Sequence, residues 1–214
     1  VASITGAWEF YGLPMKVTPD VLIPRMDTEL LVTTAKELLL GRKMDARILD
    51  LCCGSGCIAC ALGHELPATK LVAVDISANA LEIARENFAS NRLGSRAICI
   101  QADATSSPPM SIGQFDMIVS NPPYIASAEI MTLDSAVRDY EPIWALDGGE
   151  DGYRFYKAII KYWKSLLRPG GFLLFEVGEG QAATVKDMLS SAGFRAVGSR
   201  LDTLNIERVV IGKM

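Results

Sequence analysis

The sequence predicts an α/β protein built on a mostly parallel sheet with helices on both faces. Short apolar runs alternate with longer segments of helical periodicity along most of the chain, and strands that alternate with helices in this way form parallel sheets. The two closing runs, 194–200 and 207–214, are close enough together to pair antiparallel. With five runs before them, these predict a seven-stranded sheet with one antiparallel strand at or near an edge.

The predicted elements follow one another in a regular order. A small N-terminal β-hairpin is expected at 7–17 and a helix at 28–40. The parallel strands are expected at 46–51, 69–77, 97–103, 115–120 and 171–178. The remaining helices are expected at 57–66, 77–94, 151–171 and 181–193. Ser77 is expected to cap the second of these and Gly94 to end it. The segment 127–152 is expected to be a surface loop that could help to recognise a protein partner.

Length and composition are those of one globular domain. The chain has 214 residues, of which 50% are hydrophobic and 21% charged. A net charge of −4 argues against a large nucleic-acid-binding face, and the apolar runs are too short to span a bilayer. The 5 cysteines are crowded together, which predicts free thiols in a reducing cytoplasm. The chain opens without Met, so a segment upstream is expected.

Polar side chains stand at the ends of four successive predicted strands. These are Asp50, Asp75, Asp103 and Asn121. Ligands of open α/β sheets bind beyond the carboxyl ends of the strands, where these side chains should meet. Each acid alone could merely cap the helix that follows it, but all four together favour a ligand site.

A glycine turn follows the first of these acids. Gly54 and Gly56 allow the backbone to approach a bound molecule closely, and "GSGCIA" also fits a loosened dinucleotide fingerprint. Asp50 would repel a pyrophosphate but attract an ammonium group, and Asp75 suits the hydroxyls of a ribose. S-adenosyl-L-methionine has both an ammonium and a ribose.

Several motifs together resemble the class I S-adenosylmethionine-dependent methyltransferases, which have a Rossmann-like fold. They are "LDLCCGSG", "VDIS", "QAD" and "SNPPY". "TGAWEFYGLPMKV" and "LIPRMDTELLV" narrow the resemblance to the peptide chain release factor glutamine methyltransferases, over essentially the whole chain. "NPPY" alone is less specific, because adenine methyltransferases of DNA also use it.

The resemblance implies an enzyme that methylates the glutamine side-chain amide in a Gly-Gly-Gln motif of release factors, leaving S-adenosyl-L-homocysteine. Residues 1–26 would be the end of an interdomain connection, and 27–214 the methyltransferase domain. The expected cofactor contacts are Arg25, Thr28, Asp50, Cys52, Cys53, Gly54, Ser55, Gly56, Asp75, Ile76, Asp103, Ala104 and Asn121. The expected substrate contacts are Asn121, Pro122, Pro123 and Tyr124, of which Asn121, Pro122 and Tyr124 would act in catalysis. The mouth of the site would be lined by Pro24, Arg25, Asp27, Thr28 and Glu29.

The chemistry of amide methylation explains the residues of "NPPY". The amide nitrogen is a poor nucleophile because its lone pair is delocalised into the carbonyl. The Asn121 side-chain oxygen and the Pro122 backbone carbonyl can each accept one N–H, and this directs the lone pair at the methyl group. Tyr124 offers a wall against the flat amide and can contact the sulfonium region. No general base is expected, since an N-methylated amide cation loses its proton easily. His64 is expected at the far end of a helix.

The glycine turn departs from the family at Cys52, where Gly is usual, and at Cys53, where Thr is frequent. A Cβ disfavours a positive φ, so the path of the loop at Cys52 is left open by the sequence.

Other function classes are weighed against this one. Cys53, Cys57 and Cys60 have an iron–sulfur-like spacing, but a helix there favours packed thiols, and no metal is expected. An adenine amino-methyltransferase of DNA or RNA would share the "NPPY" corner, and a non-catalytic S-adenosylmethionine-binding module would share the fold. We expect a monomer that acts on a release factor, without stable nucleic-acid or membrane binding.

Overall fold

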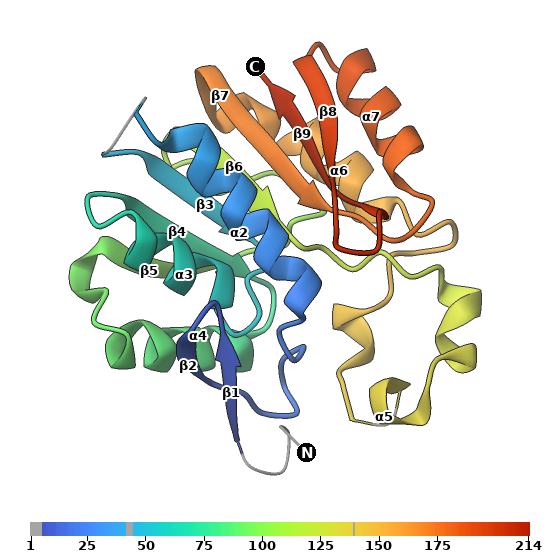
Figure 1. Ribbon diagram of the computed structural model, residues 1–214, viewed down its shortest axis with the longest axis horizontal. Helices are drawn as coiled ribbons and strands as arrows, with labels where there is room; N and C mark the ends of the chain where they lie inside the picture. Colours follow the sequence, from blue (N-terminus) through green and yellow to red (C-terminus); the bar gives the residue numbers. More distant parts are fainter. Residues whose placement is uncertain (1–5, 42–44, 139) are drawn as a thin grey trace.

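The computed structural model describes residues 6–41, 45–138 and 140–214, and its centre is a seven-stranded sheet (Figure 1). The strand order is β5-β4-β3-β6-β7-β9-β8. Strand β9 is antiparallel to both neighbours, while the pairs from β5 to β7 are parallel. The strands are β3 (Arg47–Leu51), β4 (Lys70–Asp75), β5 (Ala97–Gln101), β6 (Phe115–Ser120), β7 (Leu167–Glu176), β8 (Arg195–Leu201) and β9 (Glu207–Lys213). The predicted sheet class, with one antiparallel strand next to an edge, is confirmed.

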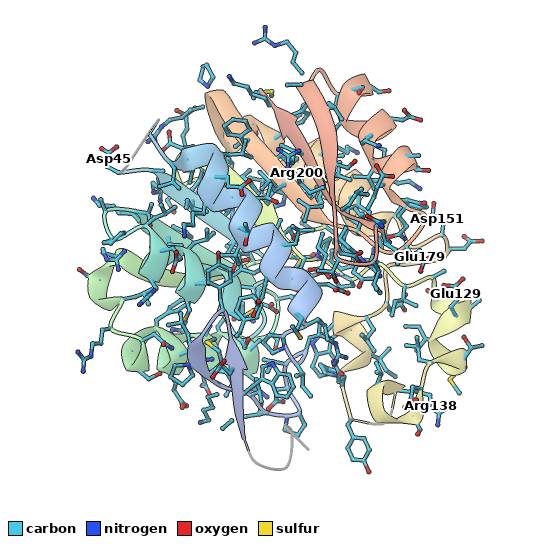
Figure 2. All side chains as sticks on the ribbon, viewed as in Figure 1. Asp45, Glu129, Arg138, Asp151, Glu179 and Arg200 are labelled. Carbon is cyan, nitrogen blue, oxygen red and sulfur yellow. The ribbon has the colours of Figure 1, made fainter. Side chains whose placement is uncertain are left out.

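Helices cover both faces of the sheet, as predicted. They are α2 (Met26–Leu39), α3 (Cys57–Glu65), α4 (Ala78–Ser90), α6 (Arg154–Tyr162) and α7 (Ala182–Ser191). Successive strand residues point to opposite faces. Ile48 accordingly packs in the core that α2, α3 and α4 share, and Leu49 in the core that α6 and α7 share. Charged side chains of both signs, such as those of Asp45, Glu129 and Arg200, which Figure 2 labels, are exposed.

The predicted hairpin is present and packs in the core that α2, α3 and α4 share. Its strands are β1 (Ala7–Phe10) and β2 (Leu13–Lys16), paired antiparallel. Phe10, Leu13 and Met15 are buried in the same core as α2 and α3. The first five residues of the predicted interdomain connection lie outside the described residues.

The chain makes an excursion between β6 and α6 (Figure 1). It contains η2 (Ser127–Thr132), α5 (Ser135–Arg138) and η3 (Ile143–Ala145), and Asp139 within it lies outside the described residues. Its return is tied to its start, because the Ile125 amide donates to Leu146 and the Gly148 amide to Ile125. The excursion therefore comes back to the carboxyl ends of the strands.

Two predicted helix boundaries are wrong. Helix α2 begins at Met26 rather than 28. Ser77 caps α4 as predicted, accepting from the Ala80 amide at 3.2 Å, but Gly94 does not end that helix. Arg92 takes the left-handed φ of 59°, and the amides of Arg92 and Leu93 close a Schellman motif onto Ala89 and Phe88.

The segment predicted as one helix at 151–171 forms an α-helix, a short 3₁₀ helix and the start of a strand. Helix α6 ends at Tyr162, and after η4 (Lys164–Leu166) the chain already joins the sheet at Leu167. The glycines read as a stop signal lie inside β7, where Gly170 has a φ of 78° and its amide donates to Met214. Within the described ranges, no helix is both long and apolar enough to cross a bilayer.

Candidate active site

A cavity of about 310 Å³ opens at the carboxyl ends of the parallel strands. This is where open α/β sheets bind their ligands. The predicted site residues on its wall are Pro24, Thr28, Cys52, Cys53, Gly54, Ser55, Asp75, Ile76, Asp103, Ala104, Asn121 and Pro123. Of the four strand-end residues, Asp75, Asp103 and Asn121 lie on this wall. Asp50 lies near the end of β3 as predicted but is not on the wall, and Asp103 stands beyond β5, which ends at Gln101 rather than at 103.

The glycine loop is held in place by backbone and carboxylate hydrogen bonds. The Cys53 amide donates to Val74 at 3.0 Å, and the Gly54 amide donates to Asp75 Oδ2 at 2.9 Å. Gly56 has a φ of 76°, and a Cβ there would lie 2.8 Å from the ring of Phe88 on α4. Gly56 therefore serves the close approach of the loop to α4 and does not line the cavity.

Cys52 has a left-handed backbone with a φ of 59°, a conformation that glycine adopts more readily than a residue with a Cβ. The path of the loop, which the sequence leaves open at Cys52, is therefore left-handed there. Non-glycine residues in this region carry a strain of order 1 kcal/mol or more. The strain is tolerated because the Cys53 and Gly54 amides that follow are hydrogen-bonded, and because the Cys52 thiol packs against the core that α6 and α7 share.

We expect Cys52→Gly to stabilise the protein by about 0.5–1 kcal/mol, since it removes this strain. Urea unfolding of the two proteins measures the difference. Arg92→Gly is a matched control, because Arg92 has the same φ of 59° and lies outside the cavity wall. A loss of stability in Cys52→Gly alone would show that contacts of the thiol outweigh the backbone strain.

Asp75 holds two parts of the site together. Its Oδ2 accepts from Gly54 and its Oδ1 accepts from the Ser77 amide at 3.0 Å. Burial raises the pKa of Asp75, although these N–H groups act in the opposite direction. Each carboxylate oxygen retains a free lone pair, so Asp75 can accept hydrogen bonds from a ligand on the cavity wall.

Asp50 lies beneath the glycine loop and is fully buried. Its Oδ2 accepts from the Ala59 amide at 3.2 Å, and its Oδ1 has no partner in the described part of the chain. Burial raises the pKa of Asp50 to about 8, the Ala59 bond opposes this, and the Asp75 charge adds to it. A buried carboxyl oxygen that accepts no hydrogen bond suits a ligand with a positively charged donor group, such as an ammonium.

The raised pKa of Asp50 predicts a pH-dependent stability. The folded protein binds this proton more tightly than the unfolded chain, so the free energy of unfolding falls as pH rises from about 4 towards 8. Asp50→Asn should flatten that decline between about pH 6 and pH 8. The substitution should leave part of the decline in place, since burial also raises the pKa of Glu176 to about 7. Urea unfolding of the ligand-free protein at both pH values checks this, and an unchanged slope would contradict it.

Asn121 projects into the cavity beside Thr28. The Asn121 Nδ2 donates to the Thr28 hydroxyl at 3.4 Å, and that hydroxyl also hydrogen-bonds the buried Glu176 carboxyl. A threonine hydroxyl has one proton, so when it donates to Glu176 it must accept from Asn121. The Asn121 amide is thereby oriented with Nδ2 towards Thr28, which leaves Oδ1 as an acceptor for another molecule.

The other residues of "NPPY" lie partly on the cavity wall and partly outside it. Pro123 lines the cavity, whereas Pro122 and Tyr124 do not. The Tyr124 carbonyl accepts from Gln181 Nε2 at 2.9 Å. Burial raises the pKa of Tyr124 to about 12, so its phenol stays protonated at neutral pH.

Three residues expected at the mouth have other partners. Arg25 forms an ion pair with the buried Glu141 of the excursion. Asp27 faces Arg208 at 3.8 Å, and Glu29 accepts from the Tyr11 amide of the hairpin at 2.8 Å. The structure therefore does not place Arg25 on the cavity wall.

The rest of the wall comes from residues that were not among the predicted cofactor or substrate contacts. The side chains concerned are Asp20, Val21, Leu22, Cys57, Ile58, Val74, Ala80, Ala102, Thr105, Trp144, Ala145, Asp147, Arg154 and Phe155. The second half of the segment 127–152 is partly exposed, with Trp144 at 54%, and it also contributes Trp144, Ala145 and Asp147 to the cavity wall. No periodic or motif signal predicts a cavity position for these three residues, which the return of the excursion brings there.

The cysteine run packs as small apolar residues. Cys57 and Cys60 lie on α3 with exposed fractions of 7% and 0%, and burial raises the pKa of both thiols well above the ordinary value. Among the residues described, no group of His, Cys, Asp and Glu is arranged to hold a metal ion. His64 stands near the end of α3, beside Glu65 and away from the cavity wall.

Comparisons with known proteins agree on one kind of enzyme. Residues 26–137 match the family described as "Methyltransferase small domain". A release factor glutamine methyltransferase from Geobacter sulfurreducens is 44% identical over 211 residues, which cover 99% of this chain and 72% of the relative. One from Bradyrhizobium diazoefficiens is 45% identical over 194 residues, which cover 90% of this chain and 64% of the relative.

Solved structures show the same fold at lower identity. The crystal structure of the hMettl16 catalytic domain in complex with MAT2A 3′UTR hairpin 6 aligns with a TM-score of 0.75 at 19% identity. The alignment covers 94% of this chain and 76% of that chain. At this identity the likeness concerns the fold alone.

Proposed function

Because this chain belongs to the release factor glutamine methyltransferases, we propose that it methylates the side-chain amide nitrogen of a glutamine in a peptide chain release factor, with S-adenosyl-L-methionine as methyl donor. The observation that carries the chemistry is the Asn121 amide on the cavity wall. Its Nδ2 is committed to Thr28 and its Oδ1 is left to accept.

The cavity has the groups that the cofactor requires. Asp75 and Ile76 would hold the ribose end, and Asp103 and Ala104 would border the adenine. The glycine loop would enclose the methionine part, above the unpartnered oxygen of Asp50. Each of these groups lies on or directly beneath one continuous wall. When bound, S-adenosyl-L-methionine supplies an electrophilic methyl group and leaves as S-adenosyl-L-homocysteine.

The residues of the chain act by orienting the glutamine amide. Asn121 Oδ1 accepts one N–H and the Pro122 carbonyl accepts the other, so the nitrogen lone pair is directed along the S–CH₃ axis. The stiff Pro122–Pro123 backbone fixes the Pro122 carbonyl and the Thr28 contact fixes the Asn121 amide before the substrate arrives, which is the source of most of the rate gain. Tyr124 supports the corner from behind.

The transfer balances without a protein base. S-adenosyl-L-methionine held by Asp75, Asp103 and the glycine loop would supply the methyl group for the new N–CH₃ bond and would keep the electron pair of the bond that breaks. The methylated amide nitrogen carries a positive charge for as long as it retains its extra proton, and it releases that proton to water. Asn121 and Pro122 accept hydrogen bonds throughout and take no proton.

The direct test is mass spectrometry of a release factor after incubation with enzyme and S-adenosyl-L-methionine. We expect one added methyl group on a single glutamine, within a Gly-Gly-Gln motif. An adenine-containing oligonucleotide serves as the competing substrate. Methylation of the oligonucleotide and not of the protein would favour the adenine methyltransferase alternative, and cofactor binding with no transfer would favour a binding module.

We further propose that the enzyme acts as a monomer in the cytoplasm, where release factors function. Light scattering coupled to size-exclusion chromatography, with and without a release factor, measures the assembly directly. A stable dimer of the free enzyme would contradict the monomer.

A further inference from the structure

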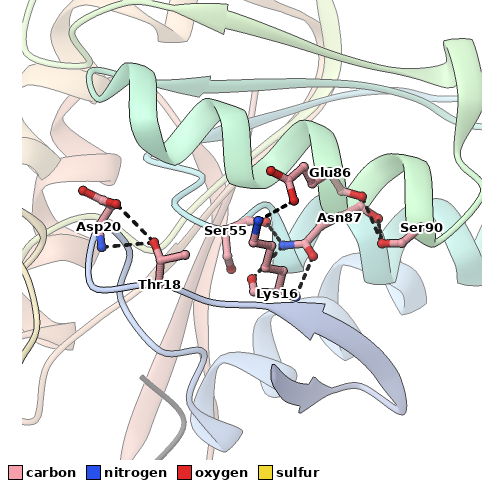
Figure 3. A network of polar contacts seen from close by, with 7 residues as sticks. All are labelled: Lys16, Thr18, Asp20, Ser55, Glu86, Asn87 and Ser90. Carbon is pink, nitrogen blue, oxygen red and sulfur yellow. Dashed lines mark hydrogen bonds and ion pairs between the residues drawn. The ribbon is translucent and has the colours of Figure 1, made fainter. Parts of the chain in front are cut away.

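Asn87 is a fully buried polar side chain that the proposed chemistry does not use. It lies on α4, behind the glycine loop (Figure 3). Its Oδ1 accepts from the Lys16 amide at 2.7 Å, and its Nδ2 donates to the Lys16 carbonyl at 3.0 Å and to the Ser55 carbonyl at 2.8 Å. One side-chain amide thus pairs with the end of the hairpin and with the glycine loop at once.

The two segments that Asn87 joins lead to separate parts of the cavity wall. Ser55 belongs to the glycine loop and lines the cavity itself. Lys16 ends β2, and the chain that follows it supplies Asp20, Val21 and Leu22 to the wall. These two parts of the wall are remote in sequence, and Asn87 bonds directly to the backbone of both.

The glycine loop and the segment that follows the hairpin are both held closely against α4. Gly56 lies so close to Phe88 and Ala84 that a Cβ would clash, so the loop rests directly on α4. Asn79, also on α4, donates to Asp20 at 3.1 Å and holds the other end of the hairpin-following segment. Helix α4 is therefore the common support of both parts of the wall.

The neighbouring polar contacts cannot replace Asn87. The ion pair between Lys16 and Glu86 is exposed at both side chains, and such pairs are worth little. Asn91, one turn further along α4, donates to the Pro14 carbonyl at 3.0 Å. It holds the hairpin but has no bond to the glycine loop, which makes it a natural control.

We propose that Asn87 is a positioning residue that holds the two parts of the cofactor cavity in register, so that S-adenosyl-L-methionine affinity depends on it. The proposal rests on the proposed function for the identity of the ligand. Loss of the Nδ2 donor leaves the Ser55 carbonyl without its buried bond and the Lys16 carbonyl without its partly buried one, which releases the loop from α4. The methyl-transfer corner at Asn121 is not touched.

The test compares Asn87→Ala and Asn87→Asp with Asn91→Ala, using calorimetric titration of S-adenosyl-L-methionine. Asn87→Asp fills the same space and keeps one acceptor but has no donor. We expect both Asn87 variants to bind the cofactor about tenfold or more weakly, since one lost bond of this kind corresponds to roughly that factor. We expect kcat at saturating cofactor to be retained. Asn91→Ala should lower the melting temperature without changing the dissociation constant.

Hydrogen exchange of the unaltered protein gives a second measurement. The Lys16 amide is bonded to Asn87 and is not on the cavity wall. If Asn87 couples the two segments, bound cofactor should slow exchange at Lys16 more than at Ile206, whose amide is held by Asp202 outside the cavity wall. Equal slowing at both amides would overturn the proposal.

The outcomes separate this proposal from the proposed function. If the unaltered protein does not bind S-adenosyl-L-methionine at all, the proposed cofactor is wrong. If it binds, and the Asn87 variants bind as tightly as Asn91→Ala, the positioning role is wrong and the proposed function stands.

Discussion

Asn121→Ala is expected to lower kcat by about a hundredfold or more, while the dissociation constant of S-adenosyl-L-methionine changes by less than about threefold. The Asn121 Oδ1 is the acceptor that the Thr28 contact leaves unused. Without it the glutamine amide loses one of the two acceptors that direct its lone pair. The loss therefore appears in the transfer step and not in cofactor binding. Single-turnover methylation of a release factor together with calorimetric titration of the cofactor measures both quantities.

Thr28→Val is the companion to this variant. It keeps the shape of Thr28 but removes the hydroxyl that orients the Asn121 amide. The amide can then rotate and present Nδ2 to the substrate, so kcat should fall by about tenfold, less than in Asn121→Ala. Turnover that is unchanged in Asn121→Ala would refute the assigned role of Asn121. Unchanged turnover in Thr28→Val alone would show that the amide is oriented by other contacts.

Asp75→Ala is expected to weaken S-adenosyl-L-methionine binding on the order of a hundredfold, because hydrogen bonds to a carboxylate each contribute about 1.5–3 kcal/mol. Asp75 contributes to cofactor binding in two ways. Its free lone pairs can accept from the ribose hydroxyls, and its bonds to Gly54 and Ser77 hold the wall itself. The effect should lie in the dissociation constant, with most of kcat recovered at saturating cofactor.

Asp202→Ala is the matched control for Asp75→Ala. Asp202 also accepts from the amide two residues further on, Leu204, at 2.8 Å, and it lies outside the cavity wall. Its removal should lower the melting temperature through the lost turn without altering cofactor binding. Equal dissociation constants in Asp75→Ala and the unaltered protein would show that Asp75 has no part in holding the cofactor.

The strands and most helices could be predicted because their signals are local. The apolar runs at β3, β4, β6 and β7 and the cap at Ser77 depend on neighbouring residues alone. The two main errors have different origins. Arg92 ends α4 through a local Schellman motif, in a left-handed backbone that glycine favours. Gly170 and Gly171 predict a helix stop, but they lie within β7, where they exchange backbone hydrogen bonds with Met214 at the far end of the chain.

The site could be predicted in part for the same reason. Strand ends of a parallel sheet meet at one edge, so Asp75, Asp103 and Asn121 could be placed together before any coordinates were known. Arg25 could not be placed, because its partner Glu141 is 116 residues away. Nor could Trp144, whose position depends on how the excursion folds back.

The sequence by itself determined the fold class, the glycine loop, the strand-end acids and the "NPPY" corner, since residue type and spacing decide all of these. Only the tertiary structure decided that Thr28 orients Asn121, that Asn87 joins the hairpin to the glycine loop, and that Cys52 accepts a left-handed backbone. The reason is physical. A buried polar side chain acts through its hydrogen-bond partners. Partners that tertiary packing brings together have no regular spacing in the sequence, so no sequence pattern predicts them.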